Sequence, residues 1–132
     1  MMSDIKNIVL LEDEPDDVFL ISRQLKKSGI EAEIRVCVNK QEFEELLSQL
    51  KPDIILADYD VPGFYGYEAL LLSRSHDASI PFIFITGCML PNSIKEEIES
   101  RAEAYTLKDD IKELPILIEK VWIEFLARNI TD

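Results

Sequence analysis

The chain has 132 residues, and its 47% apolar and 30% charged content excludes an intrinsically disordered chain. Its 26 acidic residues outnumber its 14 basic ones, and the resulting net charge of −12 argues against direct contact with nucleic-acid phosphates. No apolar run approaches the roughly 20 residues of a spanning helix, and the start MMSDIK lacks an apolar signal core, so we expect a cytoplasmic protein. This length predicts a single domain over residues 1–132, with its core at about 6–129.

Five short apolar runs alternate along the chain with longer segments of helical periodicity. The runs are Ile8–Leu11, Ile34–Val38, Ile54–Ala57, Phe82–Ile85 and a weaker one at Ala104–Leu107. Their β-branched content and lack of alternation are typical of strands buried on both faces. The pattern predicts an α/β fold, a five-stranded parallel sheet with five helices on both faces, and leaves the strand order open.

The first two helices carry start and stop signals. Pro15 suits the first position of a helix, and Gly29 suits its end. Asn39 followed by Glu42 predicts a capping box for the second helix, which Pro52 ends. The inward stripes are expected to be Val18, Ile21 and Leu25 on the first helix, and Phe43, Leu46, Leu47 and Leu50 on the second.

The last three helices are less regular. We expect the third near Tyr65–Arg74, the fourth near Asn92–Arg101 with little apolar surface beyond Ile94 and Ile98, and the fifth over about Ile111–Asn129. The inward positions are Tyr67, Leu70 and Leu71 on the third helix, and Leu114, Ile118, Val121 and Phe125 on the fifth. Further apolar residues of the fifth helix, with no obvious core to enter, are Ile116, Ile123, Leu126 and Ile130.

Polar residues follow four of the apolar runs, at the sheet edge where parallel strands bind ligands. Carboxylates that converge there repel one another unless a cation lies between them, and their hard oxygens suit Mg²⁺ or Mn²⁺. Taken without the others, each of these residues equally suits an ordinary structural role in a solvated loop, a turn, a helix N-terminus or the surface. The candidates are Glu12, Asp13 and Glu14 after the first run, Asp58 after the third, Thr86 after the fourth and Lys108 after the fifth.

Asp58 directly follows a buried strand, and this position favours use of its carboxylate as a nucleophile. An aspartate that attacks a phosphoryl donor forms an acyl phosphate, and a divalent metal neutralises the transferring oxygens. The Thr86 hydroxyl can hydrogen-bond a phosphoryl oxygen beside Gly87, and Lys108 supplies a mobile positive charge. The combination therefore favours phosphoryl transfer.

The order of these motifs resembles the receiver domain of two-component response regulators, over about Lys6–Asn129, and agrees with a doubly wound fold of the flavodoxin or CheY type. IVLLEDEP resembles the family's first strand with its acidic pair, and DIILADYDVPG resembles its phosphoacceptor strand and loop. IFITG and AYTLKDD resemble the strands that carry the switch hydroxyl, the switch aromatic residue and the lysine. The roles that the resemblance implies are catalysis for Asp58, Thr86 and Lys108, Mg²⁺ or Mn²⁺ binding for Glu12, Asp13, Asp58 and the backbone carbonyl of Asp60, and switching for Thr86 and Tyr105.

The resemblance also implies a function and partners. Asp58 would accept a phosphoryl group from a histidine kinase or a phosphotransfer protein, dephosphorylate itself slowly and turn over no external substrate. The population would shift toward an active conformation, read by an output partner or a second copy through the fourth helix, fifth strand and fifth helix. On that surface, Ile116, Ile123 and Ile130 suit such a partner or a neighbouring domain of a larger hybrid protein.

Three positions depart from the family pattern. Asp109 stands where proline is usual, and a cis peptide bond without proline costs about 2.5–4 kcal/mol, which puts the family's cis bond in question here. Gly87 replaces a commoner alanine, and Asp60 adds a carboxylate beside the acceptor. We predict that these last two residues alter the kinetics of dephosphorylation.

Two other classes of function stay open. The DYDV segment that begins at Asp58 also resembles the nucleophile motif of haloacid-dehalogenase-type phosphatases, which place it after their first strand and need a capping region. The other class is a pseudo-receiver, an interaction domain that works without phosphorylation. A pseudo-receiver would normally lack a residue of the receiver site, and all five are present: Glu12, Asp13, Asp58, Thr86 and Lys108.

Overall fold

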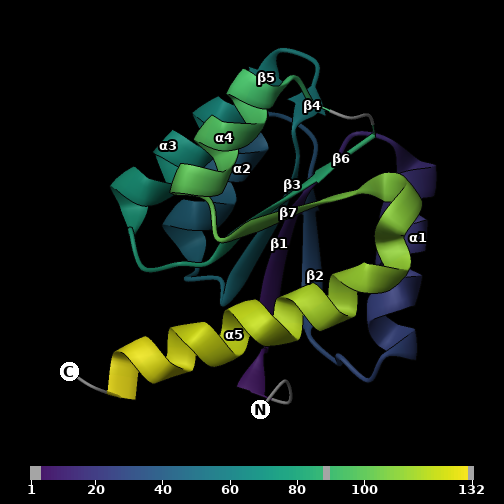
Figure 1. The fold of residues 1–132 in the computed structure, drawn as a ribbon, viewed down its shortest axis with the longest axis vertical. Coiled ribbons are helices and arrows are strands. Elements are labelled where there is room, and N and C mark those ends of the chain that lie inside the picture. The colour runs from purple at the N-terminus through teal and green to yellow at the C-terminus, as the bar shows by residue number, and fades with distance from the viewer. Residues whose placement is uncertain (1–3, 88–89, 131–132) are drawn as a thin grey trace.

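The structure is a computed structural model that describes residues 4–87 and 90–130, with the backbone alone at Ile130 (Figure 1). Five strands form one parallel sheet in the order β2-β1-β3-β6-β7, the doubly wound order in which the chain reverses direction across the sheet. The predicted sheet is confirmed, and each strand lies within one residue of its predicted bounds. These strands are β1 (Asn7–Leu11), β2 (Glu33–Cys37), β3 (Ile54–Asp58), β6 (Phe82–Thr86) and β7 (Ala104–Leu107).

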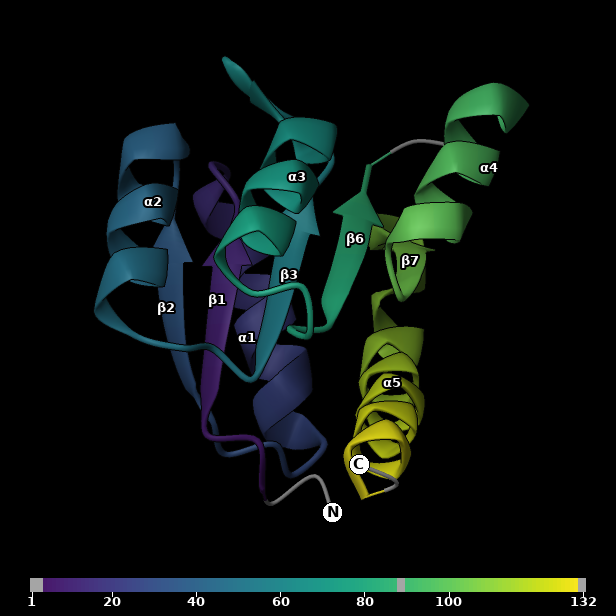
Figure 2. The same cartoon turned by 90° about the vertical axis from the view of Figure 1, so that its left-hand side faces the viewer.

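Five α-helices cover both faces of the sheet, as predicted. They are α1 (Pro15–Lys27), α2 (Lys40–Gln49), α3 (Gly66–His76), α4 (Asn92–Arg101) and α5 (Leu114–Ile130). Buried residues of α1 and α5 share one apolar cluster with one face of the sheet, and those of α2, α3 and α4 share a second cluster with the other. Figure 2 shows α2 and α3 in front of the sheet and α1 behind it.

The signals of the first two helices act as the sequence predicts. Pro15 occupies the start of α1, and Gly29 follows its end with a φ of 86°, a left-handed conformation that glycine adopts without strain. The Asn39 side chain accepts a hydrogen bond from the Glu42 N–H at 2.9 Å. The Glu42 carboxylate in turn accepts from the N–H of Val38, one residue earlier than in a standard capping box, at 3.0 Å.

The third helix corrects the prediction of an inward Leu71. This helix begins at Gly66, and its buried positions recur at the spacing of one helix face, so Leu71 lies on the outer side and is 47% exposed. The buried positions are Gly66, Ala69, Leu70 and Ser73. A hairpin of two short strands, β4 (Asp60–Val61) and β5 (Phe64–Tyr65), precedes the helix and was not predicted, because strands of two residues leave no periodicity to detect.

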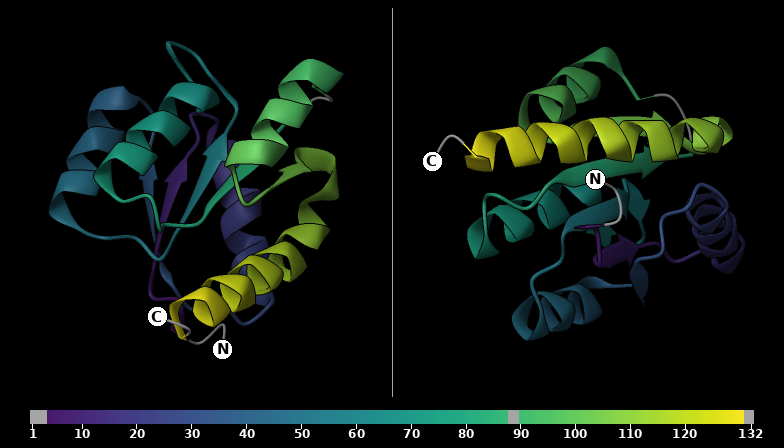
Figure 3. Two further views of the ribbon diagram at one scale, coloured as in Figure 1. Left: turned by 60° about the vertical axis from the view of Figure 1, so that its left-hand side comes forward. Right: turned by 90° about the horizontal axis from the view of Figure 1, so that it is seen from below.

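The C-terminal helix begins three residues later than predicted. A 3-10 helix, η2 (Lys108–Glu113), lies between β7 and α5, and no peptide bond of the described residues is cis, so the Lys108–Asp109 bond is trans. The long α5 crosses the end of the molecule at which the sheet begins (Figure 3). No helix in the described part of the chain is long and apolar enough to span a membrane.

The two apolar stripes predicted for α5 differ in their surroundings. Leu114, Ile118 and Val121 are buried, and Trp122 packs with them at 5% exposure. The second stripe includes Leu126, which packs partly against the core, while Ile116 and Ile123 are 65% and 54% exposed. The side chain predicted at Ile130 lies outside the described residues. The surplus apolar surface is therefore carried by Ile116 and Ile123.

Candidate functional site

The candidate site lies where β1, β3, β6 and β7 end, at the upper edge of the sheet in Figure 1. The strand register pairs Leu11 with Ala57, Asp58 with Ile85 and Thr86 with Leu107. The residues that directly follow or end these strands therefore lie at one edge, as the sequence predicts for parallel strands. Five predicted site residues meet there: Glu12, Asp13, Asp58, Thr86 and Lys108.

Three carboxylates converge at this edge. Glu12, Asp13 and Asp58 each bring one oxygen to a group in which all oxygens lie within 4.8 Å of one another. Glu12 is 1% and Asp58 5% exposed, so water contributes little to stabilising their charges. Three carboxylate oxygens at this separation fit a hard divalent cation such as Mg²⁺ or Mn²⁺.

Lys108 supplies the positive charge of the site. It is the first residue of η2, and its ammonium Nζ lies 2.6 Å from Asp17 Oδ2, 2.9 Å from Glu12 Oε1 and 3.0 Å from Asp58 Oδ2. The lysine side chain is 19% exposed, so these ion pairs are screened less than pairs at the surface. One ammonium thus ties β1, β3 and α1 together at the site.

The buried charges shift the pKa values of two of these groups. Burial raises the pKa of Glu12 to about 7, and the neighbouring Asp58 charge adds to the rise, whereas the hydrogen bond from Lys108 opposes it. Burial lowers the pKa of Lys108, but hydrogen bonds to Asp17, Glu12 and Asp58 outweigh this effect and raise it above the ordinary value. Lys108 is therefore firmly charged, and Glu12 lies in a site that a further cation would stabilise.

Both oxygens of Asp58 have partners. Oδ2 accepts from Lys108, and Oδ1 accepts from the backbone N–H of Asp60 at 3.0 Å. Asp60 begins the β4–β5 hairpin, whose turn has Gly63 at a φ of 78°, and its own side chain is exposed and outside the cluster of three carboxylates. The hairpin thus orients the Asp58 carboxylate, and the metal contact predicted for the Asp60 carbonyl stays a prediction.

Strand β6 ends in Thr86, which is 1% exposed and is followed by Gly87. Among the described residues, a Cβ at Gly87 would meet only the Lys108 Cδ atom, at 3.8 Å, which is ordinary van der Waals contact. An alanine would fit at this position without moving the lysine. The described surroundings of Gly87 therefore do not require glycine.

Tyr105, the predicted switch aromatic residue, lies in β7 and is half-buried against the second apolar cluster. It pairs in register with Phe84 of β6. The Nζ atom of Lys95, in α4, lies 5.8 Å from the centroid of the Tyr105 ring. The tyrosine is thus part of the sheet and also contacts α4.

The sequence prediction did not include Asp17 in the site, although this residue makes the shortest contact with Lys108. Asp17 also lies in the first turn of α1, where a negative charge is favourable in any helix. Its spacing of four residues from the buried Ile21 is the signal that could have identified it, because residues i and i+4 share one face of a helix. The inward face of α1 thus begins with a carboxylate at the site.

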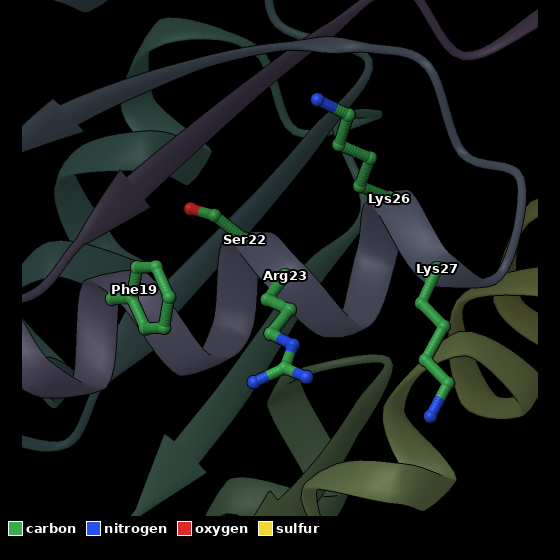
Figure 4. A pocket seen from close by; sticks show the side chains of 5 residues that line it. All are labelled: Phe19, Ser22, Arg23, Lys26 and Lys27. Atoms are coloured by element: carbon green, nitrogen blue, oxygen red, sulfur yellow. The ribbon is translucent and has the colours of Figure 1, made fainter.

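A shallow hollow of about 550 Å³ runs along the outer side of α1 (Figure 4). Its lining combines an aromatic ring that is 62% exposed, that of Phe19, with three cationic side chains. The charge of this surface is opposite to that of the chain as a whole, which is −12. The lining residues are Phe19, Ser22, Arg23, Lys26 and Lys27.

Comparisons with known proteins relate this arrangement to characterised families. The family described as "Response regulator receiver domain" matches residues 8–119. "Regulatory protein AtoC" of Escherichia coli (strain K12) is 26% identical over 121 residues, which are 90% of this chain and 26% of AtoC. A "Probable cyclic di-GMP phosphodiesterase" of Vibrio cholerae serotype O1 is 28% identical over 116 residues, which are 86% of this chain and 25% of that protein. The chain spans about a quarter of the length of these two curated relatives.

Among solved structures, the Mn²⁺-bound form of response regulator Rcp1 is 25% identical to this chain, with a TM-score of 0.73. The match covers 90% of this chain and 95% of that one. The two chains therefore share their fold over nearly their whole lengths.

Proposed function

Because the chain belongs to the response regulator receiver domain family, we propose that it is a phosphorylation-dependent switch that accepts a phosphoryl group on Asp58. The observation that most supports this proposal is the convergence of Glu12, Asp13 and Lys108 on the Asp58 carboxylate. The match over residues 8–119 supports the expectation of a single domain, and the cytoplasm remains the expected location.

The proposed reaction begins at a carboxylate oxygen of Asp58. This oxygen attacks the phosphorus of a phosphohistidine, a P–O bond forms, and the P–N bond breaks with its electron pair on the imidazole. The ammonium of Lys108, already 3.0 Å from Asp58, balances the added negative charge. The Thr86 hydroxyl donates a hydrogen bond to a phosphoryl oxygen. The only chemistry proposed is phosphorylation of the chain itself and its slow reversal.

We propose that Glu12, Asp13 and Asp58, with the Asp60 carbonyl, hold Mg²⁺ or Mn²⁺. When bound, the ion neutralises charge on the transferring oxygens. The relative solved with Mn²⁺ supports this choice of ion. The mutual repulsion of the three carboxylates favours binding of a cation between them.

The proposed phosphodonor is a sensor histidine kinase or a phosphotransfer protein, which must bring its phosphohistidine to the edge of the sheet. The exposed ring of Phe19 and the cations of α1 support a role of this helix as part of the contact surface. The proposed output surface is α4, β7 and α5, where Ile116 and Ile123 leave apolar area for a partner or a second copy. No direct contact with nucleic acid or membrane is proposed.

Incubation with Mg²⁺ and acetyl phosphate, followed by intact-protein mass spectrometry, tests the proposed function. We expect the mass of one phosphoryl group on the wild type and none on Asp58→Asn. An unmodified wild type that is folded and binds Mg²⁺ would point to a phosphorylation-independent interaction domain. Rapid consumption of acetyl phosphate without accumulation would point to a phosphohydrolase.

A further inference from the structure

The fourth helix is held to the rest of the molecule by little apolar surface. Ile98 is the buried residue of α4, and Ile94 packs only partly against the core. Figure 2 shows α4 beside β7, on the side of its layer opposite to α2. Polar side chains must therefore contribute to its position.

Two cations of α4 lie over tyrosine rings of two different elements. Lys95 Nζ is 5.8 Å from the ring centroid of Tyr105 in β7, and the guanidinium of Arg101 is 5.7 Å from that of Tyr67 in α3. Both distances are within the range of a cation–π contact. The helix is thus fixed near its start to β7 and at its end to α3.

The Lys95 contact involves the residue with the proposed switch role. Tyr105 is half-buried and pairs in register with Phe84, two residues before Thr86 along β6. Hydrogen bonding to the Tyr105 side chain raises the pKa of Lys95, which agrees with an ammonium held close to this tyrosine. The geometric observation is the 5.8 Å distance between the Lys95 Nζ atom and the centroid of the Tyr105 ring.

We propose that Lys95 is a positioning residue that holds Tyr105 in its half-buried place and thereby opposes the rearrangement that follows phosphorylation. In the family that this chain resembles, the switch aromatic residue turns inward when the domain is phosphorylated. A cation–π contact exists only while ring and ammonium face each other, so a Tyr105 ring that turned inward would give it up. Any contact made in one state alone shifts the population toward that state. This inference rests on the proposed function, since it assigns Lys95 to the switch of the same site.

The test compares Lys95→Gln with Arg101→Gln, a matched control that removes the other cation–π contact of the same helix. The first readout is the rate of phosphorylation by acetyl phosphate with Mg²⁺, and the second is the NMR signal of the Tyr105 ring in the unphosphorylated protein. For Lys95→Gln we expect a rate about two- to fivefold higher, the size of one exposed cation–π contact, and a Tyr105 signal displaced toward its phosphorylated position. Lys95→Arg, which keeps the cation, should restore the wild-type rate and signal.

The controls separate this inference from the proposed function. Equal effects of Lys95→Gln and Arg101→Gln would mean that looser attachment of α4 explains the change, and this result would overturn the role of Lys95. An unchanged rate and Tyr105 signal in Lys95→Gln would overturn it as well. A wild type that takes up no phosphoryl group at all would instead refute the proposed function.

Discussion

At the residue scale, the charges around Lys108 do not balance. Its single ammonium lies within 3.0 Å of oxygens of Asp17, Glu12 and Asp58, and Asp13 adds a further carboxylate to the cluster. Like charges in a poorly solvated site destabilise the folded state, because unfolding separates them and returns them to water. The residues best suited to bind a metal therefore cost stability when no cation is bound.

Asp13→Asn removes one of these charges with little change of shape. Without Mg²⁺, we expect the free energy of unfolding to rise by about 1 kcal/mol, the energy of one charge pair at this separation in a water-like dielectric. With Mg²⁺, the added stabilisation by the ion should be smaller than in the wild type. Urea unfolding with and without Mg²⁺ measures both effects.

Asp16→Asn is the matched control, because Asp16 is exposed in the first turn of α1 and outside the carboxylate cluster. Its stability should change by less than about 0.5 kcal/mol, and its response to Mg²⁺ should match that of the wild type. Loss of stability in Asp13→Asn without Mg²⁺ would contradict the charge argument.

Gly87→Ala and Asp60→Asn test the two departures beside the acceptor. In the part of the chain that the structure describes, a Cβ at Gly87 meets only Lys108 Cδ, at 3.8 Å, and Asp60 is exposed, so the stability of each variant should stay within about 0.5 kcal/mol of the wild type. The first-order rate of loss of the phosphoryl group, followed by intact mass, is expected to change by at least about twofold in each variant. Two time courses that superimpose on the wild type would remove these residues from the control of phosphate lifetime.

At the element scale, burial on both faces made the strands predictable. The three central strands β1, β3 and β6 are almost entirely apolar and buried, as is typical of a parallel sheet covered on both faces, whereas the edge strand β2 includes the charged residues Glu33 and Arg35. The third helix was harder to predict because its inner face uses the small residues Ala69 and Ser73, while a large apolar residue, Leu71, lies outside. A pattern that ranks positions by hydrophobicity therefore predicted Leu70 correctly but also placed Leu71 inside.

Ser73→Ala is expected to stabilise the protein. Among the described residues, the buried Ser73 Oγ has no hydrogen-bond partner, and an unpaired buried hydroxyl is destabilising. The free energy of unfolding should rise by about 0.5–1.5 kcal/mol. Urea unfolding of Ser73→Ala and of Ser75→Ala provides the comparison.

Ser75 serves as the control because it lies on the same helix but is exposed, and its Oγ donates to the Leu72 carbonyl at 2.7 Å. Ser75→Ala should change stability by less than about 0.5 kcal/mol. A loss of stability in Ser73→Ala would mean that the buried hydroxyl has a stabilising partner.

At the scale of the whole molecule, one arginine joins elements that are distant in the sequence. The Arg74 guanidinium in α3 donates to the carbonyls of Ile80 and Arg101 at 2.7 and 2.8 Å and pairs with Glu103 at 2.9 Å. Glu103 also accepts from the N–H of Phe82 at 2.6 Å. The end of α3, the start of β6 and the end of α4 therefore meet at one side chain.

Arg74→Lys keeps the charge but cannot reproduce the planar donor set of the guanidinium. We expect the free energy of unfolding to fall by about 1–3 kcal/mol, because acceptors that are mostly half-buried lose charge-assisted hydrogen bonds. Thermal or urea unfolding measures this loss. Arg23→Lys, at an exposed position of α1, should leave stability nearly unchanged, and equal losses in both variants would contradict the role assigned to Arg74.

The sequence predicted the strand-end residues of the site but not the contacts that its helices make. Glu12, Asp58, Thr86 and Lys108 were predictable because parallel strands end at one edge, so position along the chain implies position in space. Asp17 and the contact of Lys95 with Tyr105 depend on how helices are rotated against the sheet, which local patterns do not determine. Contacts between elements, rather than residues within them, were the part that required the structure.

The position of the tryptophan gives the molecule an optical reporter. Trp122 is the one tryptophan of the chain, 5% exposed and stacked on Phe125 at a centroid distance of 5.0 Å, and it belongs to the apolar cluster that α1 and α5 share. Since α4 packs on the opposite face of the sheet, emission from this indole should follow melting of the α1–α5 side and remain nearly constant during rearrangements confined to α4. Fluorescence and the Tyr105 resonance would thus view the two faces of the sheet separately.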